Sequence, residues 1–323
     1  MTPRTPRRAP GTPRRAPGAA PAGAVQVVVV LVIVVLAAGC GSTGGAAGAP
    51  HGDGRPAVVA STDVWGSVVR AVGGDAVDVH SIVDDPTADP HSYESTASDA
   101  ADVLGADLVV FNGGGYDRFI AQILASADRE VPAVEAVAVG GTVGVTSDNE
   151  HVWYDLPTVE AVAQRVAQQL GTLDPARAAT FSANAEEFGR EIDALTGRVS
   201  KIRQQHEGAR VALTEPIASH LIEAAGLTDA TPPQFVQAVE EGTGPPAAAV
   251  AETLQLLSGR GVAVLVVNPQ TETPVTRKVR STAEAAAVPV VEMTETLPES
   301  TGYVAWMSRQ IGSLDKGLEQ GRR

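Results

Sequence analysis

From residue 57 onward, short runs of β-branched residues alternate with stretches in which apolar residues recur at helical spacing. This alternation is typical of βαβ units and predicts an α/β fold of two lobes, each with a mostly parallel sheet. Thr273 followed by Pro274 is a typical helix start, with Val275, Val279 and Ala283 on one face. The expected strands are 57–60, 77–83, 107–111, 210–214, 262–267 and 289–292, with helices near 64–72, 98–104 and 218–225.

The most regular stretch of the chain begins at Asp174-Pro175 and runs to about Gln205. Its apolar residues are spaced alternately four and three apart, which places them on one stripe of a single helix. A helix of this length is on the order of 45 Å long, enough to join the two lobes as a rigid strut that permits only a small opening motion. A coiled-coil dimer is the competing interpretation, but fewer than four heptads favour the strut. The stripe consists of Phe181, Ala185, Phe188, Ile192, Leu195, Val199 and Ile202.

The first forty residues have the pattern of a secretion signal. Five arginines precede an apolar segment from Ala24 to Ala38, and Cys40 ends the run Leu36-Ala37-Ala38-Gly39-Cys40. The segment is shorter than the ~20 residues that span a bilayer, and its basic front and small-residue exit are typical of a cleaved signal. We therefore expect lipid attachment at Cys40 and a location on the outer face of the cell membrane; a transmembrane helix followed by a buried cysteine is the alternative.

These patterns divide the chain into five segments. The signal peptide covers 1–40, and the Gly- and Ala-rich stretch 41–56 is expected to be a flexible tether. The N-terminal α/β lobe covers 57–157, the helical region with the long linking helix 158–206, and the C-terminal α/β lobe 207–323. Because Cys40 is the only cysteine, we expect no disulfide to stabilise the fold.

The charge of the chain bears on its partners. The formal charge is −14, and it becomes −19 without residues 1–40, which hold five arginines and no acidic residue. Such a charge argues against nucleic acid or anionic lipid as a partner and is compatible with attraction of cations.

Two of the six histidines stand out by their context. His91 lies in a turn-rich segment after the strand expected at 77–83, and carboxyl ends of strands are where α/β sheets place ligand sites. His151 lies between the first lobe and the next helix, and Glu215 follows the strand expected at 210–214. His220 is a reserve ligand, although a packed or solvated role is favoured for it. His80 and His206 are expected to be structural, and His51 solvated.

The chain resembles the metal-binding lipoproteins of ABC importers, the TroA-like cluster A-I that supplies zinc or manganese to a permease. The resemblance covers nearly the whole mature chain. It implies two α/β lobes joined by one long helix with a metal ion in the cleft between them, and metal ligation by His91 and His151. It is carried by Asp89-Pro90-His91-Ser92-Tyr93-Glu94, Ser98-Asp99, 106–113, His151-Val152-Trp153-Tyr154-Asp155 and Gly226-Leu227.

The resemblance also concerns the remaining ligands. Counting back from Gly226-Leu227 places Glu215 at the third ligand position, where manganese members often have glutamate. The fourth ligand, usually an aspartate, aligns with Thr301 or Gly302, neither of which can replace a carboxylate. Water or a nearby acid such as Glu299 then completes the shell, or the affinity is reduced.

Two imidazoles with one or two carboxylates suit zinc, manganese or ferrous iron, and the absence of thiolates disfavours Cu(I). We expect a monomeric receptor, not an enzyme, that captures zinc or manganese and delivers it to an ABC permease, with binding that weakens as the imidazoles gain protons. A surface metallohydrolase and a metal-binding adhesin without a transporter are the alternatives.

Overall fold

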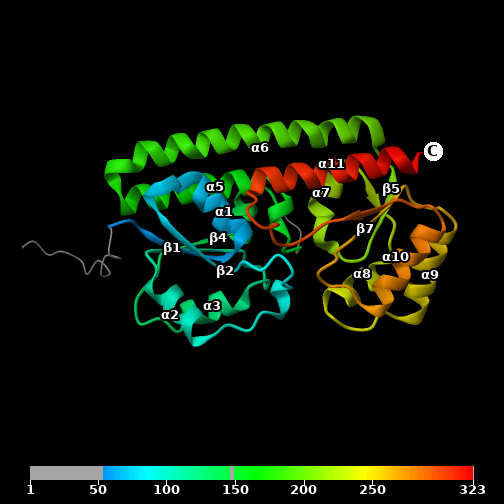
Figure 1. Ribbon diagram of the computed structural model, residues 1–323, viewed down its shortest axis with the longest axis horizontal. Coiled ribbons are helices and arrows are strands. Elements are labelled where there is room, and N and C mark those ends of the chain that lie inside the picture. Colours follow the sequence, from blue (N-terminus) through cyan, green and yellow to red (C-terminus); the bar gives the residue numbers. More distant parts are fainter. Residues whose placement is uncertain (1–53, 146–148, 323) are drawn as a thin grey trace, which may run out of the picture. The chain divides into compact units, whose positions relative to one another are not determined.

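The computed structural model describes residues 54–145 and 149–322, and these described residues belong to one compact unit. Two separate four-stranded sheets organise this unit into two lobes (Figure 1). Both sheets are parallel, with orders β2-β1-β3-β4 and β6-β5-β7-β8. The strands are β1 Ala57–Thr62, β2 Asp78–Val83, β3 Leu108–Phe111, β4 Ala133–Glu135, β5 Arg210–Leu213, β6 Thr228–Asp229, β7 Val264–Val267 and β8 Val290–Glu292.

The helices cover both faces of each sheet, which confirms the α/β prediction. In the first sheet, alternate residues such as Val109 pack against α2 and α3, whereas Val110 faces α1, α5 and α6. In the second sheet, Leu265 packs against α8, α9 and α10, whereas Val266 faces α7 and α11. The helices are α1 Asp63–Gly73, α2 Ala97–Gly105, α3 Arg118–Ala125, α4 Ala136–Thr142, α5 Leu156–Leu173, α6 Ala178–His206, α7 Ser219–Ala224, α8 Pro233–Glu240, α9 Ala247–Ser258, α10 Pro274–Ala285 and α11 Tyr303–Gly321.

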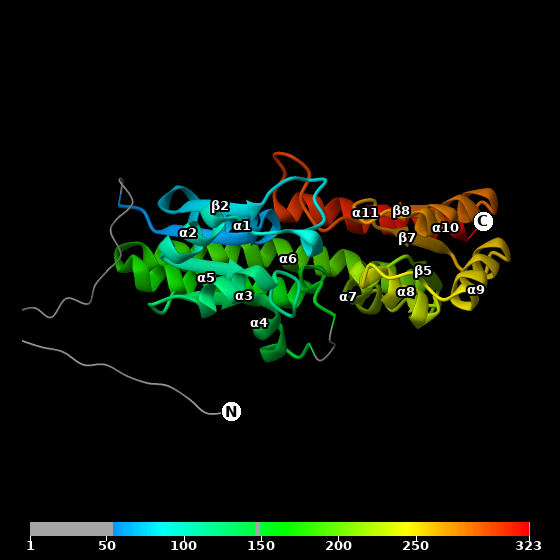
Figure 2. The ribbon, with the colours of Figure 1, turned by 90° about the horizontal axis from the view of Figure 1, so that it is seen from below.

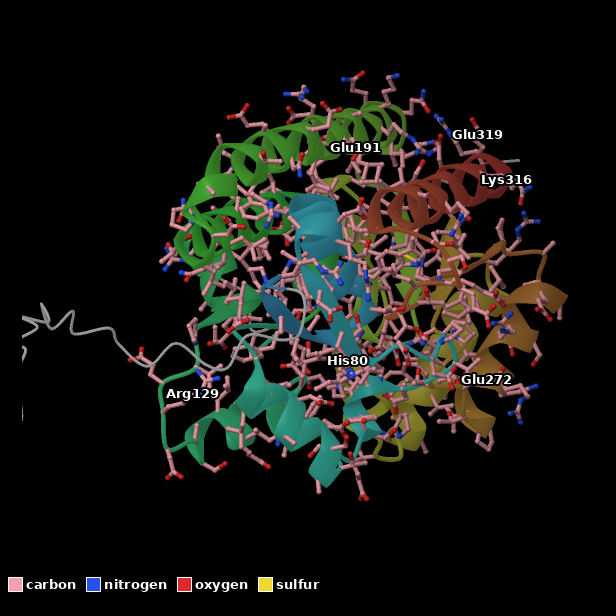
Figure 3. The ribbon with its side chains drawn as sticks, turned by 60° about the vertical axis from the view of Figure 1, so that its left-hand side comes forward. His80, Arg129, Glu191, Glu272, Lys316 and Glu319 are labelled. Atoms are coloured by element: carbon pink, nitrogen blue, oxygen red, sulfur yellow. The ribbon has the colours of Figure 1, made fainter. Side chains whose placement is uncertain are left out.

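The long helix predicted from the hydrophobic stripe is α6, which has 29 residues, and all seven stripe residues are buried. It does not join the lobes alone, because α11 packs against it and runs beside it (Figures 1 and 2). One continuous apolar cluster contains residues of both sheets, α6 and α11. The exposed sides of these helices are charged, as Glu191, Lys316 and Glu319 in Figure 3 illustrate. The shared core therefore ties the two lobes together.

The parallel topology decides where polar side chains can gather. The strands β1, β2, β3, β5, β7 and β8 all end in loops or helix starts that carry polar residues. Because the strands of each sheet are parallel, these loops lie at one edge of that sheet. Hydrogen bonds join the loops of the first sheet to those of the second, such as Tyr116 to Glu295 and Asp63 to the backbone of Leu297.

Candidate metal centre

His91 is held by a short 3-10 helix, Pro90–Ser92, in the loop after β2. The Asp89 carboxylate caps this helix by accepting from the backbone N–H of His91 at 3.0 Å, and Pro90 occupies a position whose N–H would be unsatisfied. The Asp-Pro-His sequence therefore fixes the backbone at His91 locally. The imidazole packs edge-on against Tyr116, with ring centroids 4.7 Å apart, and its side chain is 23% exposed.

His151 is almost completely buried, with 1% of its side chain exposed. Asn149 accepts through Oδ1 from the backbone N–H of His151 at 2.8 Å and lies 2.7 Å from its Nδ1, while its own Nδ2 donates to the carbonyl of Pro216. These partners fix the orientation of the Asn149 amide, so its oxygen faces Nδ1. Nδ1 therefore carries the proton, and Nε2 of His151 presents a lone pair.

Glu295 lies in the loop after β8 and brings a buried carboxylate from the second lobe. Its Oε1 accepts from Asn268 Nδ2 at 2.7 Å, and its Oε2 accepts from the Tyr116 hydroxyl at 2.9 Å. Tyr116 is positioned by the glycine run after β3, in which Gly113 has φ 79°, as favoured by the absence of a Cβ. Asp117 holds this turn by accepting from the backbone N–H groups of Asn112 and Gly113.

The side chains of His91, His151 and Glu295 converge, with one ligand atom of each within 4.8 Å of the others. His91 Nε2 lies 3.5 Å from Glu295 Oε2. Within the part of the chain that the structure describes, the buried Nε2 atoms of both histidines have no hydrogen-bond partner. A lone pair that faces carboxylate oxygens is stabilised only by a cation between them, either a proton or a metal ion.

Glu240, the last residue of α8, adds a second carboxylate to this group. Its Oε1 lies 3.7 Å from His91 Nε2 and 3.6 Å from His151 Nε2. Two ligand atoms bound about 2.1 Å from one zinc ion in tetrahedral geometry lie about 3.4 Å apart. The separations of 3.5–3.7 Å around His91 Nε2 and Glu240 Oε1 are close to this value.

The group opens to solvent on the side of His91. A pocket of about 400 Å³ is lined by His91, Tyr116, Arg118, Glu150 and Glu240, among other residues. Glu150 Oε1 lies 3.6 Å from His91 Nδ1, so the two ring nitrogens of His91 face different carboxylates. His91, Glu150 and Glu240 form a second group whose ligand atoms lie within 4.8 Å of one another. Acidic side chains therefore line the approach to the buried nitrogens.

Glu215 lies beside these groups but is not a member of either one. It follows β5, is 2% exposed, and its carboxylate accepts from Asn268 Nδ2 and from the Thr271 hydroxyl, the latter at 2.6 Å. Since Asn268 Nδ2 also donates to Glu295, one amide joins the two carboxylates. As a metal ligand, Glu215 stays a prediction.

The fourth ligand, which the alignment with Thr301 or Gly302 left open, stays a prediction. The carboxylate that the structure brings to the histidines from this region is Glu295, whereas Glu299, the acid expected nearby, is exposed. Glu295 follows the strand β8, and the carboxyl-end rule that singled out His91 and Glu215 also points to it. No sequence pattern points to Glu240, because it reaches the site through the packing of α8 and not through a place after a strand.

The remaining described histidines lie outside both groups. His220 is buried, and its Nε2 lies 3.1 Å from the carbonyl oxygen of Asn149, so it packs behind His151. His80 is exposed on β2, 3.8 Å from the Asp102 carboxylate. His206 is buried at the end of α6. Cys40 and His51 lie outside the described residues.

Burial dominates the protonation of the site. Desolvation lowers the pKa of His91, and that of His151 well below its ordinary value, with the neighbouring His91 adding to the effect. Desolvation and mutual repulsion act in the opposite direction on the acids. They raise the pKa of Glu215 to about 6, that of Glu240 to about 8 and that of Glu295 well above its usual range. The imidazoles are thus neutral, and a bound cation would displace protons from the carboxyl groups.

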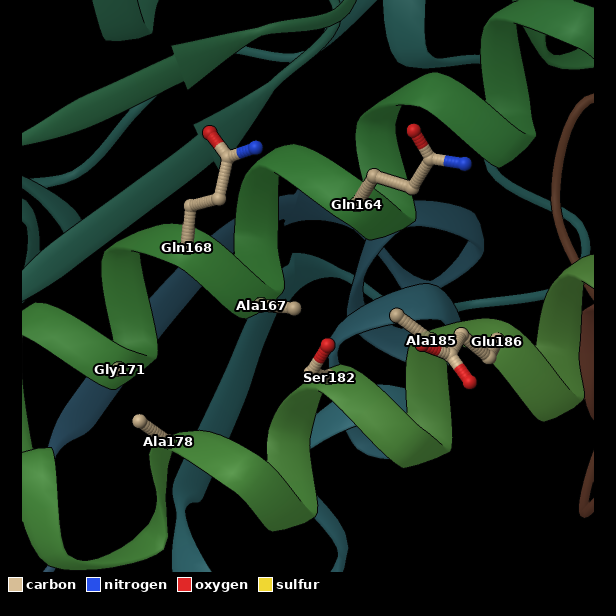
Figure 4. Close-up of a pocket in the computed structure, with 8 residues that line it drawn as sticks. All are labelled: Gln164, Ala167, Gln168, Gly171, Ala178, Ser182, Ala185 and Glu186. Carbon is tan, nitrogen blue, oxygen red and sulfur yellow. The ribbon is translucent and has the colours of Figure 1, made fainter.

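A second hollow lies between α5 and α6 and has a different character (Figure 4). It measures about 500 Å³ and is lined by small and amide side chains, with Glu186 as its one acidic residue. It offers neither imidazole nor a pair of carboxylates. Both groups of possible metal ligands found among the described residues instead contain His91, in the loop after β2.

The fold has two α/β lobes with parallel sheets, and imidazoles and carboxylates gather where strands of both sheets end. This arrangement is that of a two-lobed binding protein whose side chains can hold a cation. Residues 58–317 match the family model ZnuA, "Zinc-uptake complex component A periplasmic", and the chain belongs to this family. The TroA-like resemblance stated from the sequence motifs is thereby confirmed.

The sequence identity to individual relatives is low. The metal ABC transporter substrate-binding lipoprotein SsaB of Streptococcus sanguinis is 27% identical over 43% of this chain, and the alignment spans about half (48%) of its length. The iron ABC transporter substrate-binding lipoprotein MtsA of Streptococcus pyogenes is 23% identical over 81% of this chain and 88% of its own. The solute-binding protein FpvC of Pseudomonas aeruginosa, solved with Ni2+, has the same fold, with a TM-score of 0.68, 21% identity and coverage of 82% of this chain and 97% of its own.

Proposed function

We propose that this protein captures a divalent transition-metal ion as cargo between its two lobes. The observation that carries the proposal is the convergence of unpartnered Nε2 atoms from His91 and His151 on carboxylate oxygens. These atoms come from loops of both sheets, so a single ion bound there contacts both lobes. The acidic approach and the formal charge of −14 favour a cation over an anion.

The ligand set we propose is His91, His151 and Glu295, with Glu240 or Glu215 as the fourth. Two imidazoles and two carboxylates suit zinc, manganese and ferrous iron. Four side-chain ligands fill a tetrahedral shell without an open position for a reactive water, which supports capture without catalysis. Relatives carry names that refer to manganese and iron, which supports a transition metal without selecting one.

We further propose that the ion is delivered to an ABC permease, with the protein acting as a monomer held to the outer face of the cell membrane by lipid on Cys40. The names of relatives, which describe ABC transporter lipoproteins, support this part. None of the helices in the described part of the chain combines the length and the hydrophobicity of a membrane span.

Metal analysis of the purified protein, combined with competition titrations against zinc and manganese, tests the proposal. Wild-type protein should bind one ion, and His151→Ala and Glu295→Gln should each bind far more weakly. Loss of an outer hydrogen-bond partner typically costs roughly 10–100-fold in affinity, so loss of a ligand should cost more. Glu299→Gln, an exposed acid in the same region, is the matched control and should bind as the wild type does. Unchanged binding in both site variants would remove the assignment.

Glu215→Gln in the same titration decides the role of this residue. If Glu215 is a metal ligand, the Glu215→Gln protein should lose as much metal affinity as the Glu295→Gln protein. If its carboxylate only supports Asn268, the loss of affinity should be smaller.

A further inference from the structure

The amide of Gln270 joins the two loops that carry His91 and Glu295. Gln270 lies three residues after the end of β7, in the second lobe. Its Nε2 donates to the carbonyl of Ala88 at 2.7 Å and to that of Pro86 at 3.3 Å, both in the loop after β2 of the first lobe. Its Oε1 accepts from the backbone N–H of Glu295 at 2.6 Å. One side chain therefore bonds to both loops.

The contacts of Gln270 lie next to the groups that present the metal-binding atoms. Ala88 directly precedes Asp89, whose carboxylate caps the turn that holds His91. On the other side, the bonded N–H belongs to Glu295 itself. A shift of either loop away from Gln270 would therefore separate His91 Nε2 from Glu295 Oε2, now 3.5 Å apart.

Gln270 is itself fixed on the second lobe. Its backbone N–H donates to Asn268 Oδ1 at 3.0 Å, and its Nε2 also donates to the Thr296 hydroxyl at 2.8 Å. Its side-chain oxygen and nitrogen are thus both engaged, so the amide cannot rotate without loss of several bonds. The loop after β2 has no comparable anchor to this lobe: among the described residues, the hydrogen bonds found between 84–92 and the second lobe come from Gln270.

We propose that Gln270 is a positioning residue that clasps the loop of His91 onto the loop of Glu295, and that this clasp sets the rate at which a bound cation escapes. The proposal rests on the proposed function of metal capture. His91 lies on the solvent side of the site and lines its pocket, whereas His151 is buried. Escape of an ion therefore requires movement of the His91 loop, which the two Gln270 bonds to Ala88 and Pro86 oppose. Figure 2 shows this loop, after β2, close to the segment that leads into α11.

The test compares Gln270→Met with the wild type. Methionine keeps the length and the neutral charge of glutamine, but it cannot donate to the carbonyls of Pro86 and Ala88 or accept from the N–H of Glu295. Gln255→Met, at an exposed position on α9, is the matched control. Zinc-loaded full-length protein is mixed with excess chelator, and the release rate is measured by stopped flow. Amide hydrogen exchange of residues 84–92 and the melting curve are recorded on the metal-free proteins.

We expect Gln270→Met to release zinc at least tenfold faster than the wild type, and the amide hydrogens of residues 84–92 to exchange faster. The rate of zinc association should change by a smaller factor than the rate of release. Gln255→Met should match the wild type in both respects. Gln270→Ala is the second variant and should show the same direction if the methionine variant folds poorly. A role in overall stability alone would lower the melting temperature without loop-specific exchange.

An unchanged release rate in a folded Gln270 variant would overturn the clasp while leaving the proposed function intact. Failure of the wild type to bind zinc or manganese would instead overturn the proposed function and the retention role with it. Metal binding by the wild type therefore tests the proposed function, whereas zinc release from the Gln270 variants tests the clasp.

Discussion

The Tyr116 hydroxyl donates to Glu295 Oε2 at 2.9 Å, across 179 positions of the chain and between the two lobes. The Tyr116 ring also packs against His91 and Trp153, with centroids 4.7 Å away in both cases. Burial raises the pKa of Tyr116 well above its ordinary value, so the hydroxyl keeps its proton and remains a donor. One aromatic side chain thereby supports a histidine of the first lobe and a carboxylate of the second.

Asn149 should control the affinity through the tautomer of His151. Its Oδ1 lies 2.7 Å from His151 Nδ1, so Asn149→Ala removes the acceptor that keeps Nε2 free for a metal ion. We expect zinc affinity to fall roughly 10–100-fold, as is typical for an outer partner of a metal ligand. Asn149→Asp retains an acceptor for Nδ1–H and should lose less. Competition titration measures both variants, and equal affinity of Asn149→Ala and wild type would show that the tautomer is set otherwise.

The pH dependence of metal affinity should come from the carboxyl groups. From the sequence we expected binding to weaken as the imidazoles gain protons, but burial lowers the pKa of His91 and His151. Burial raises the pKa of Glu215 to about 6 and that of Glu240 to about 8, so a metal ion must displace protons from acids. Each displaced proton should raise the affinity by about one decade per pH unit below the pKa of its carboxyl group, which is about 6 for Glu215 and about 8 for Glu240. Calorimetry in buffers of different ionisation enthalpy counts these protons, and metal binding without proton release at pH 7 would contradict this assignment.

The metal-free protein should become less stable between pH 7 and 8. In the folded state Glu240 holds its proton up to about pH 8, whereas in the unfolded chain it is ionised above its ordinary value of 4.5. The folded state then binds more protons, and the free energy of unfolding falls as pH rises, by at most about 1.4 kcal/mol per pH unit for this group. The stability that the protonated Glu240 contributes is therefore lost as the pH rises through its folded-state pKa of about 8. The lowered pKa of His91 and His151 opposes this trend near pH 7, because histidines of the unfolded chain, with a pKa of ~6.5, are still partly protonated there, and this opposition fades by pH 8.

Melting curves of metal-free protein at pH 7.0, 7.5, 8.0 and 8.5 measure this loss. A change of this size corresponds to a few degrees in a domain of this length. Glu240→Gln cannot ionise and should show a smaller slope with pH. Equal slopes in wild type and variant would assign the effect to other groups.

The stripe on α6 should be essential to the common core. Ile192 is 1% exposed, and its replacement by alanine should lower the free energy of unfolding by about 2–5 kcal/mol, because it leaves a cavity in the apolar cluster that α6 shares with both sheets. Glu191→Ala, one position away on the exposed side, should change it by less than about 0.5 kcal/mol. Chemical denaturation of both variants measures the difference, and a small effect at Ile192 would argue against close packing there.

Local patterns predicted much of the fold. The long helix, the strands at 57–60 and 210–214 and the capping of α10 by Thr273 follow from spacing and helix-start signals, and the structure has them within a few residues. The strands β4 and β6 were missed because they have only three and two residues, too few for a periodic pattern. Their pairing depends on the neighbouring strands in the sheet.

The site was predicted less completely. His91 and His151 come together, as inferred from their motifs and the resemblance. Glu295, which the structure places beside the two histidines, was not singled out from the sequence, although its place after β8 was a usable signal. Glu240, Gln270 and Asn268 act through contacts between segments far apart in the chain, and no local pattern in the sequence marks such contacts.

The most direct test of metal capture is a crystal structure of the zinc-loaded protein, with the ion located by anomalous scattering at the zinc edge. The account predicts one ion within about 2.0–2.2 Å of Nε2 of His91, Nε2 of His151 and a Glu295 oxygen. It also predicts a fourth oxygen from Glu240 or Glu215. An ion bound elsewhere, or none at the strand ends between the lobes, would contradict it.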